Sequence, residues 1–257
     1  MTRGMAQKGA YETIAVAAKK YLKPNSSILD FGCGPCDKGA VLQLLGYKCF
    51  GYDDLQDAWH KIPGNKEKIL KFVSDQGIVF KLAENGPIPF GSESFDMVMA
   101  NDVLEHLHDS PRELLNDLLG LAKPNGLLLI TVPNAVNIRK RLEVLRGGTN
   151  LPRYEGYYWY PDPWRGHIRE YVEGDLRQMA QYLGLQILEL RGCDHMLDRI
   201  PARFRSLYLA VTAVFPSWKD SWLLVAKKPD GWKPKRTLPE GEFAQILGKA
   251  SSYQYER

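Results

Sequence analysis

The chain has 257 residues, 44% of them hydrophobic and 25% charged, and it carries a formal net charge of +4. This length and composition are typical of one large globular domain, with or without an appendage. Its four cysteines are irregularly spaced, which argues against a secreted disulfide framework. The N-terminal residues lack a signal-peptide pattern. The longest strongly apolar run, near residues 207–215, is far shorter than the roughly 20 residues that span a bilayer. We therefore expect a cytoplasmic protein.

The positive charge is concentrated toward the C-terminus. Residues 191–257 hold 12 basic and 7 acidic side chains, which give a net charge of +5. Residues 1–190 hold 22 basic and 23 acidic side chains, which give a net charge of −1. A basic segment of this kind is either a solvated surface or a contact for an anionic partner or membrane surface. The sequence leaves both interpretations open.

Apolar runs alternate with helical patterns over the first half of the chain. Strands are predicted at residues 26–32, 47–53, 78–82, 95–100 and 126–133, and helices at 36–46, 55–77 and 109–126. We expect the second helix to break near Pro63. The third is expected to start with Ser110 as N-cap and Pro111 at the first helical position, with Glu113 closing a capping box. This order of elements predicts a doubly wound α/β sheet.

After Pro133 the pattern changes. A helix is predicted at 134–148, followed by an irregular segment at 149–168 that is rich in Tyr, Trp and Pro. A helix, a strand, a helix and a last strand are then predicted at 172–184, 185–192, 198–215 and 221–229. We divide the chain into an N-terminal helical segment (1–25), a main domain (26–229) with a lid insertion (149–168), and a tail (230–257) that is mobile or wraps the surface.

The stretch "ILDFGCGPCDKGA" at residues 28–40 allows two interpretations. Its Cys33-Gly-Pro-Cys36 is the redox tetrapeptide of thioredoxins, which would make the chain a dithiol oxidoreductase. The surrounding residues instead form a strand, a glycine-rich turn and a helix start, which is how a nucleotide site begins. Asp37 stands where a dinucleotide fingerprint has its third glycine, and its carboxylate would repel a pyrophosphate. The turn also lacks the G-K-[ST] of a P-loop.

Two further carboxylates narrow the ligand. Asp30 precedes the first glycine, where it suits a cationic group such as the ammonium of an amino acid. Asp53 ends the second strand about 20 residues later, where a carboxylate binds ribose hydroxyls. A ribose, a cationic amino group and no pyrophosphate together describe S-adenosylmethionine.

Over residues 26–191 the sequence resembles the class I S-adenosylmethionine-dependent methyltransferases. The family's D-x-G-x-G-x-G motif is present here with Cys36 in place of its last glycine. The family's adenine-binding motif corresponds to "ENGPIPF", and the strand and loop that follow it correspond to "SFDMVMANDVLEHL". The resemblance implies a Rossmann-like seven-stranded sheet, mostly parallel with one antiparallel strand, with helices on both faces. It also implies S-adenosylmethionine as cofactor. The residues assigned to the cofactor are Asp30, Gly32, Cys33, Gly34, Asp53, Asp54, Glu84, Asn101 and Asp102.

Two of the five histidines are candidates for catalysis. His106 follows the fourth strand, where open α/β sheets bind ligands. His167 lies in "RGHIREY", which resembles a pattern of small-molecule and sugar O-methyltransferases. Either histidine could remove a hydroxyl proton, or be purely structural. The aromatic segment predicts a substrate lid, whose assigned residues are Tyr157, Tyr158, Trp159, Trp164 and Arg165. We expect O-methylation of a saccharide or other small metabolite, and a resemblance to methyltransferases of bacterial glycan assembly supports this.

Several alternatives remain. The chain could be an NAD-dependent Rossmann oxidoreductase, or a cofactor-binding pseudoenzyme that acts as a partner subunit. Asp102, Glu105 and His106 resemble a metal-holding cluster of ubiquinone-type methyltransferases, but a fourth ligand is missing and we expect no metal. The segment 198–215, basic and then apolar, either packs under the last strand or lies on a membrane near a lipid-linked substrate. Nucleic acid is not an expected partner.

Overall fold

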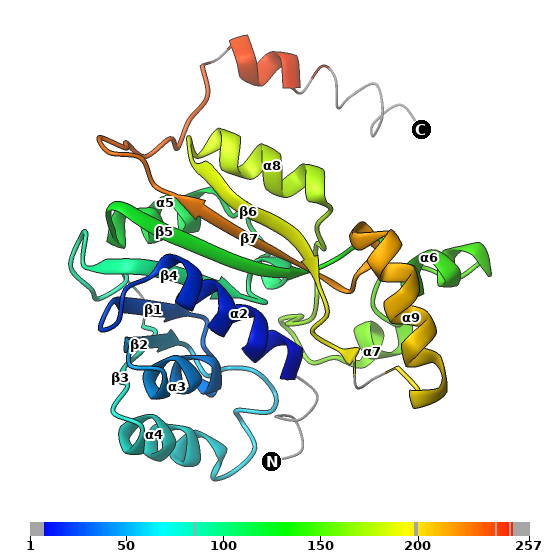
Figure 1. The fold of residues 1–257 in the computed structure, drawn as a ribbon, viewed down its shortest axis with the longest axis horizontal. Helices are drawn as coiled ribbons and strands as arrows, with labels where there is room; N and C mark the ends of the chain where they lie inside the picture. The colour runs from blue at the N-terminus through cyan, green and yellow to red at the C-terminus, as the bar shows by residue number, and fades with distance from the viewer. Residues whose placement is uncertain (1–7, 85, 198–199, 240, 247, 249–257) are drawn as a thin grey trace.

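The computed structural model describes residues 8–84, 86–197, 200–239, 241–246 and 248. Its strands form one sheet in the order β3-β2-β1-β4-β5-β7-β6 (Figure 1). The strands are β1 (Ser27–Phe31), β2 (Lys48–Asp53), β3 (Val79–Leu82), β4 (Phe95–Asn101), β5 (Ala122–Pro133), β6 (Gln186–Cys193) and β7 (Ser221–Lys227). β7 is antiparallel to both of its neighbours, and the other strand pairs are parallel. The predicted Rossmann-like fold with one antiparallel strand is confirmed.

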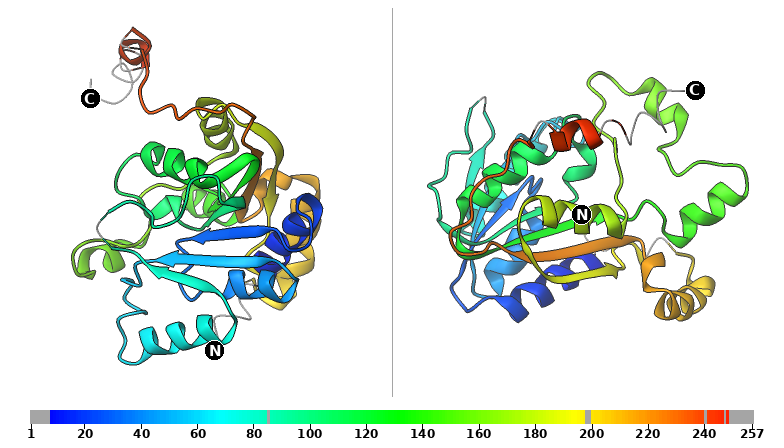
Figure 2. Two further views of the ribbon diagram at one scale, coloured as in Figure 1. Left: turned by 90° about the vertical axis from the view of Figure 1, so that its left-hand side faces the viewer. Right: turned by 90° about the horizontal axis from the view of Figure 1, so that it is seen from above.

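Helices cover both faces of the sheet because its central strands are apolar on both sides. On β5, Leu127 and Leu129 pack toward α2, α3 and α4, whereas Leu128 and Ile130 pack toward α5 and α8. This alternation is what a parallel sheet buried on both faces requires. Figure 2 shows the two helical layers from the side. The covering helices are α2 (Lys8–Tyr21), α3 (Asp37–Leu44), α4 (Asn65–Asp75), α5 (Arg112–Leu121) and α8 (Glu173–Tyr182).

A third group of helices extends beyond one end of the sheet (Figures 1 and 2). It consists of α6 (Ile138–Leu145), α7 (Tyr154–Trp159), α9 (Ala202–Val214) and the single turn η3 (Pro216–Trp218). The segment 149–168 was predicted to be irregular, but α7 forms inside it. Tyr154 and Tyr158 pack one turn apart with ring centroids 5.8 Å from each other, a spacing that stabilises a helical turn.

Two predicted helix starts were wrong. Of the helix predicted at 55–77, only the part after the break is an α-helix, because Gly64 takes a φ of +80° and starts α4 anew. α5 starts at Arg112 after Pro111, one residue later than predicted, and Pro111 at its N-cap position provides no side-chain cap. The Ser110 hydroxyl accepts a hydrogen bond from the Arg112 N–H at 3.3 Å instead.

The described part of the tail runs over α5. Arg236 forms ion pairs with Glu113 and Asp117, and the Asn116 amide bonds the backbone of Lys235. The predicted N-terminal segment corresponds to α2, and its first seven residues lie outside the described part. Among the described residues, no helix combines the length and apolar character needed to cross a membrane.

Candidate active site

The glycine-rich turn between β1 and α3 has a left-handed backbone at alternate residues. Gly32, Gly34 and Cys36 have φ values of +66°, +52° and +55°. A side chain at such a φ costs about 1 kcal/mol, which explains why the family pattern has glycine at all three positions. Cys36 therefore takes a conformation that suits glycine.

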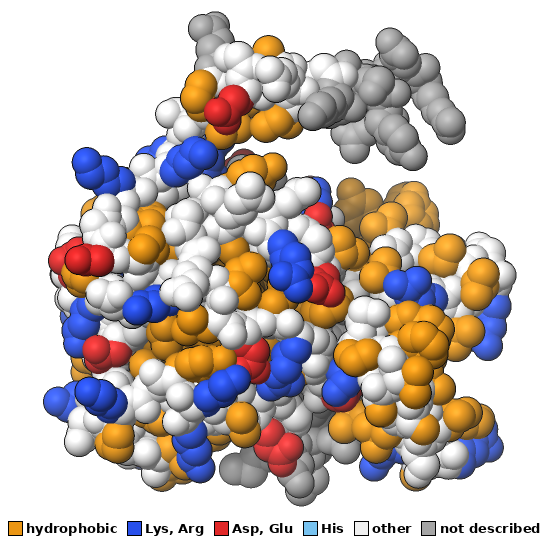
Figure 3. All heavy atoms as spheres, turned by 45° about the horizontal axis from the view of Figure 1, so that its top comes forward, with side chains coloured by type: hydrophobic (Ala, Val, Ile, Leu, Met, Phe, Trp, Pro, Cys, Tyr) orange, Lys and Arg blue, Asp and Glu red, His pale blue; other side chains and the backbone are white. Residues whose placement is uncertain are grey.

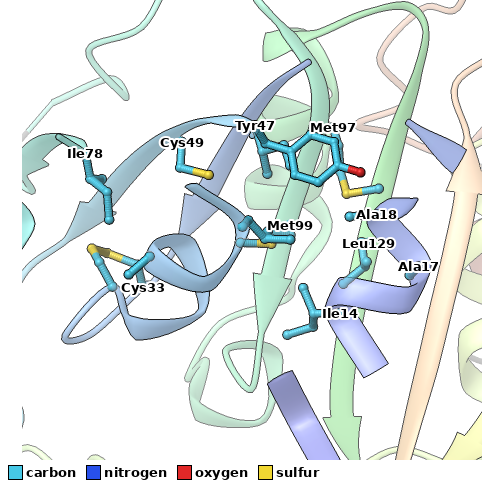
Figure 4. Packing of buried hydrophobic residues seen from close by; sticks show 14 of the residues in the cluster. Ile14, Ala17, Ala18, Cys33, Tyr47, Cys49, Ile78, Met97, Met99 and Leu129 are labelled. Carbon is cyan, nitrogen blue, oxygen red and sulfur yellow. A yellow bond between two sulfur atoms is a disulfide. The ribbon is translucent and has the colours of Figure 1, made fainter. Parts of the chain in front are cut away.

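The two cysteines of this turn form a disulfide. Both are buried, with Cys33 6% and Cys36 0% exposed, and Cys33 belongs to the core cluster that also holds Cys49 and Ile78 (Figure 4). A Cβ on Gly51 of β2 would lie 2.6 Å from the Cys36 sulfur. The turn therefore packs directly on the neighbouring strand.

The carboxylate of Asp53 joins the end of β2 to the same turn. It accepts hydrogen bonds from the N–H of Gly34 at 2.7 Å and from the N–H of Leu55 at 2.6 Å. Burial raises the pKa of Asp53 above its usual value, and the two N–H donors oppose that rise. The predicted ribose acid thus also fixes the shape of the turn.

Asp30, Lys38 and Asp102 form a charge cluster in which Asp30 is buried and Lys38 and Asp102 are partly buried. One oxygen of Asp30 faces the Asn101 amide at 3.4 Å, and the other has no partner in the described part of the chain. Burial raises the pKa of Asp30 to about 7, while the Lys38 ammonium opposes the rise. Lys38 pairs with Asp102 at 3.1 Å. Burial disfavours the charged form of Asp102, but Lys38, His195 and the Thr131 hydroxyl together hold its pKa below the usual value. Sequence reasoning missed Lys38.

A cavity of about 420 Å³ opens at the carboxyl ends of β1, β2 and β4. Its size is in the range of cofactor sites. The Phe31 and Tyr52 rings stack beside it, with centroids 5.5 Å apart. Its wall residues are Phe31, Gly32, Tyr52, Asp53, Asp54, Asp57, Ala83, Asp102, Val103, His106, Leu107, His108, Pro163, Trp164 and Arg165. Four carboxylates face one guanidinium in this wall, so it favours a cationic ligand and repels a pyrophosphate.

S-adenosylmethionine fits this donor set. It carries a sulfonium, an ammonium, a ribose and a flat base, and the wall offers carboxylates and an aromatic surface. Asp53 and Asp54 would face the ribose, and the aromatic pair would face the base. The partnerless oxygen of Asp30 and the carboxylate of Asp102 would hold the amino-acid end together with Lys38.

The segment 149–168 contributes part of the cavity wall. Arg165 pairs with Asp54 at 3.0 Å and with Asp57 at 2.8 Å. Tyr157 packs edge-on against Trp164 with ring centroids 5.2 Å apart. Of the residues assigned to substrate, only Trp164 and Arg165 line the cavity.

Among the residues assigned to cofactor and substrate, those that do not line this cavity are Asp30, Cys33, Gly34, Glu84, Asn101, Tyr157, Tyr158 and Trp159. Tyr158 and Trp159 on α7 are 60% and 76% exposed and do not line it. Glu84, assigned to the adenine, is also exposed, and its neighbour Ala83 lines the wall instead.

The two candidate histidines contact each other. Their rings meet edge to face with centroids 5.0 Å apart. The Nδ1–H of His106 donates to the carbonyl of Arg165, and the Nδ1–H of His167 donates to the carboxylate of Glu170, each at 2.8 Å. Because a carbonyl and a carboxylate only accept, the Nε2 atoms of the neutral rings carry the free lone pairs. These Nε2 atoms lie 3.9 and 4.0 Å from the Oε1 of Glu105.

Burial controls the charges of this cluster. Glu105 is fully buried, and neither of its carboxylate oxygens has a hydrogen-bond partner among the described residues. Burial raises its pKa well above the usual value. Burial, then the neighbouring His106 and Lys140, lower the pKa of His167 to about 4. His167 is therefore a neutral imidazole at pH 7.

Glu105, His106 and His167 are also the described residues that could hold a metal ion, with one ligand atom from each lying within 4.8 Å of the others. Asp102, the ligand considered from the sequence, pairs with Lys38 instead. His167 replaces it because the N–H of Ile168 donates to the Glu105 carbonyl at 2.6 Å and brings the two segments together.

A second cavity, of about 200 Å³, lies on the other side of the histidine pair. Its wall residues are Ala135, Asn150, Leu151, Pro152, His167, Ile168, Arg169 and Glu170. His106 lines the larger cavity and His167 lines the smaller one. Because the two rings touch, the pair stands between the two cavities.

The chain also resembles known proteins. A family model described as "methyltransferase domain" matches residues 3–190. An uncharacterized methyltransferase of Schizosaccharomyces pombe is 32% identical over 119 residues, which are 45% of this chain and 42% of the relative. The chain thus spans less than half the length of this curated relative.

Two solved structures share the fold. One is a SAM-dependent methyltransferase from Aquifex aeolicus, with a TM-score of 0.54 and 15% identity over 88% of this chain and 96% of the other. The second is a Burkholderia thailandensis 1,6-didemethyltoxoflavin N1-methyltransferase with bound S-adenosylhomocysteine. Its TM-score is 0.54, and its identity is 16% over 87% of this chain and 80% of the other. At these identities the likeness is one of fold.

We predict that the redox state of the cysteine pair alters cofactor binding. Reduction of the disulfide separates two sulfurs packed inside the turn, so dithiothreitol should weaken binding of S-adenosylhomocysteine several-fold relative to the diamide-treated protein. Isothermal titration calorimetry measures the difference. A Cys33→Ala/Cys36→Gly double variant, which suits the backbone at residue 36, should bind equally in both conditions. Equal affinities of the wild type in both conditions would refute the prediction.

Proposed function

Since this chain belongs to the methyltransferase-domain family and its cofactor is S-adenosylmethionine, we propose that it methylates a hydroxyl group of a saccharide or other small metabolite. When bound, the cofactor supplies a methyl carbon activated by a sulfonium. The protein has to align the hydroxyl oxygen with that carbon and take up the proton. The position of the histidine pair between the two cavities is the observation that supports the proposal best.

His167 is the proposed base. Its Nδ1–H is held by Glu170, so its Nε2 lone pair is free to accept a hydroxyl proton. The low pKa keeps the ring neutral and ready to accept at physiological pH. Once His167 is protonated, the Glu170 carboxylate that accepts its Nδ1–H at 2.8 Å can stabilise the imidazolium. His106, which lines the larger cavity and contacts His167, is the residue proposed to orient the hydroxyl toward the cofactor.

The smaller cavity is the proposed acceptor site. Asn150 and Arg169 offer polar groups to hydroxyls, and Leu151 and Pro152 give an apolar wall. This mixture suits a sugar or a similar polyhydroxylated molecule. The negative wall of the larger cavity argues against the alternative of an NAD-dependent oxidoreductase.

We predict that the wild type binds S-adenosylhomocysteine and gives no heat with NAD in calorimetry. Asp53→Ala should weaken S-adenosylhomocysteine at least about ten-fold, because it removes a hydrogen-bonded carboxylate from the cavity wall and frees the turn at Gly34. Asp75→Ala, at an exposed pair with Lys71, serves as the control and should bind like the wild type. Tight NAD binding with no response to S-adenosylhomocysteine would refute the proposal.

We predict that His167→Ala lowers methyl transfer at least about 100-fold. The assay follows label from methyl-labelled S-adenosylmethionine into a panel of glycosides and nucleotide sugars. S-adenosylhomocysteine affinity should stay within a few-fold, because His167 does not line the larger cavity. Lys71→Ala, at the exposed pair with Asp75 on α4, is the control and should turn over like the wild type. A fully active His167→Ala would exclude this residue from the reaction.

At saturating cofactor, we predict that His167 causes no loss of turnover between about pH 6 and pH 8 and that the rate falls as the pH approaches 4. The sign follows from the lowered pKa of His167: its neutral, proton-accepting form persists above a pKa of about 4 and disappears below it. Initial rates at saturating cofactor test this, and calorimetry at each pH controls for lost binding. A rate that halves near pH 6.5, the usual value for histidine, would contradict it.

A further inference from the structure

Helix α9 buries polar groups and exposes apolar side chains, which is the reverse of an ordinary surface helix. Its buried side chains are Tyr208 and Thr212, whose hydroxyls donate to the Asp194 carboxylate at 2.6 Å and to the Tyr208 carbonyl at 2.9 Å. Its large apolar side chains point outward, and the exposed ones are Phe204 (49%), Leu207 (63%), Leu209 (43%), Val214 (70%) and the following Phe215 (47%). A helix in water has the opposite arrangement.

Helix α6 extends this apolar face. Every residue of α6 is at least partly exposed, and Leu142, Val144 and Leu145 are 44%, 52% and 82% exposed. The two helices are joined through Trp218, which stacks on Phe215 at 4.6 Å and lies under the Arg141 guanidinium at 5.6 Å. Together with α7 and η3, these two helices form what we call the helical lobe (residues 138–159 and 202–218). Figure 3 shows hydrophobic side chains gathered over this lobe.

Basic residues surround the apolar face. The segment 138–148 holds Arg139, Arg141 and Arg146 against the single acid Glu143, while its Lys140 is mostly buried and pairs with Glu170. Helix α9 holds Arg203 and Arg205 and no acid. Exposed aromatic rings stand at the edge of the lobe on α7, where Tyr154 and Trp159 are 73% and 76% exposed. Apolar side chains with a basic rim and aromatic residues at the edge match the boundary between headgroups and acyl chains of an anionic bilayer.

We propose that the face formed by α6, α9 and η3 docks on the surface of a membrane that contains anionic lipids. The apolar side chains of α9 and α6 enter the acyl boundary, and the arginines contact the phosphates. Leu151, 66% exposed, belongs both to this lobe and to the wall of the smaller cavity. If the proposed function holds, docking would bring that cavity to the membrane surface and to an acceptor carried by a lipid.

Sedimentation of the full chain with vesicles tests the proposal. The wild type should bind vesicles of phosphatidylcholine with about one third phosphatidylglycerol and bind pure phosphatidylcholine much less. A Leu207→Glu/Val214→Glu variant should bind the anionic vesicles at least about ten-fold more weakly. Leu44→Glu, at a 79% exposed position of α3 outside the lobe, is the matched control and should bind like the wild type.

Three results would overturn the proposal. The first is that the wild type binds neither vesicle type. The second is that the Leu207→Glu/Val214→Glu variant binds anionic vesicles as tightly as the wild type. The third is that the wild type is a dimer in gel filtration, that the variant is a monomer, and that neither binds vesicles. Calorimetry with S-adenosylhomocysteine on the same proteins shows that the variants are folded. It also separates this proposal from the proposed function, because cofactor binding does not require a membrane.

Discussion

The hydrogen bonds from the Gly34 and Leu55 N–H groups to the partly buried Asp53 carboxylate are the contacts on which the active-site end of the molecule depends. They join the end of β2 to the turn that follows β1. With the turn fixed, Gly32 lines the cavity wall and α3 begins where Lys38 reaches Asp102. The cavity thus acquires its shape and its negative charge from residues at the ends of three parallel strands.

The sequence predicts this end of the molecule well because its signals are local. Alternating apolar residues define the strands, and Asp30, Gly32, Gly34 and Asp53 occupy fixed distances from the strand ends. What the sequence does not predict depends on contacts between distant segments. Lys38 meets Asp102 across 64 residues, and Arg165 meets Asp54 across 111.

Prediction from the sequence meets the same limit at the proposed acceptor site, the side of the histidine pair formed by residues 149–170. A pattern places the aromatic residues of 149–168 in one segment, yet it does not say which of them point inward. Trp164 and Arg165 point inward because two hydrogen bonds hold their segment against η1 (Leu104–His106): one from the His106 ring to the Arg165 carbonyl and one from the Ile168 N–H to the Glu105 carbonyl. Tyr158 and Trp159 instead lie on an exposed helical turn. The partnership of His106 and His167 likewise arises from hydrogen bonds between η1 and residues 165–169, 59 or more positions later.

The left-handed backbone at Cys36 has a consequence for how such chains are compared. What the turn requires at this position is a positive φ, and cysteine meets the requirement here while bonded to Cys33. Replacing Cys33 alone would leave a side chain in an unfavourable conformation with no cross-link to offset it, so the two positions should vary together among related sequences. A search pattern that insists on a third glycine would pass over this chain, although its backbone at Cys36 has the positive φ that a glycine would allow.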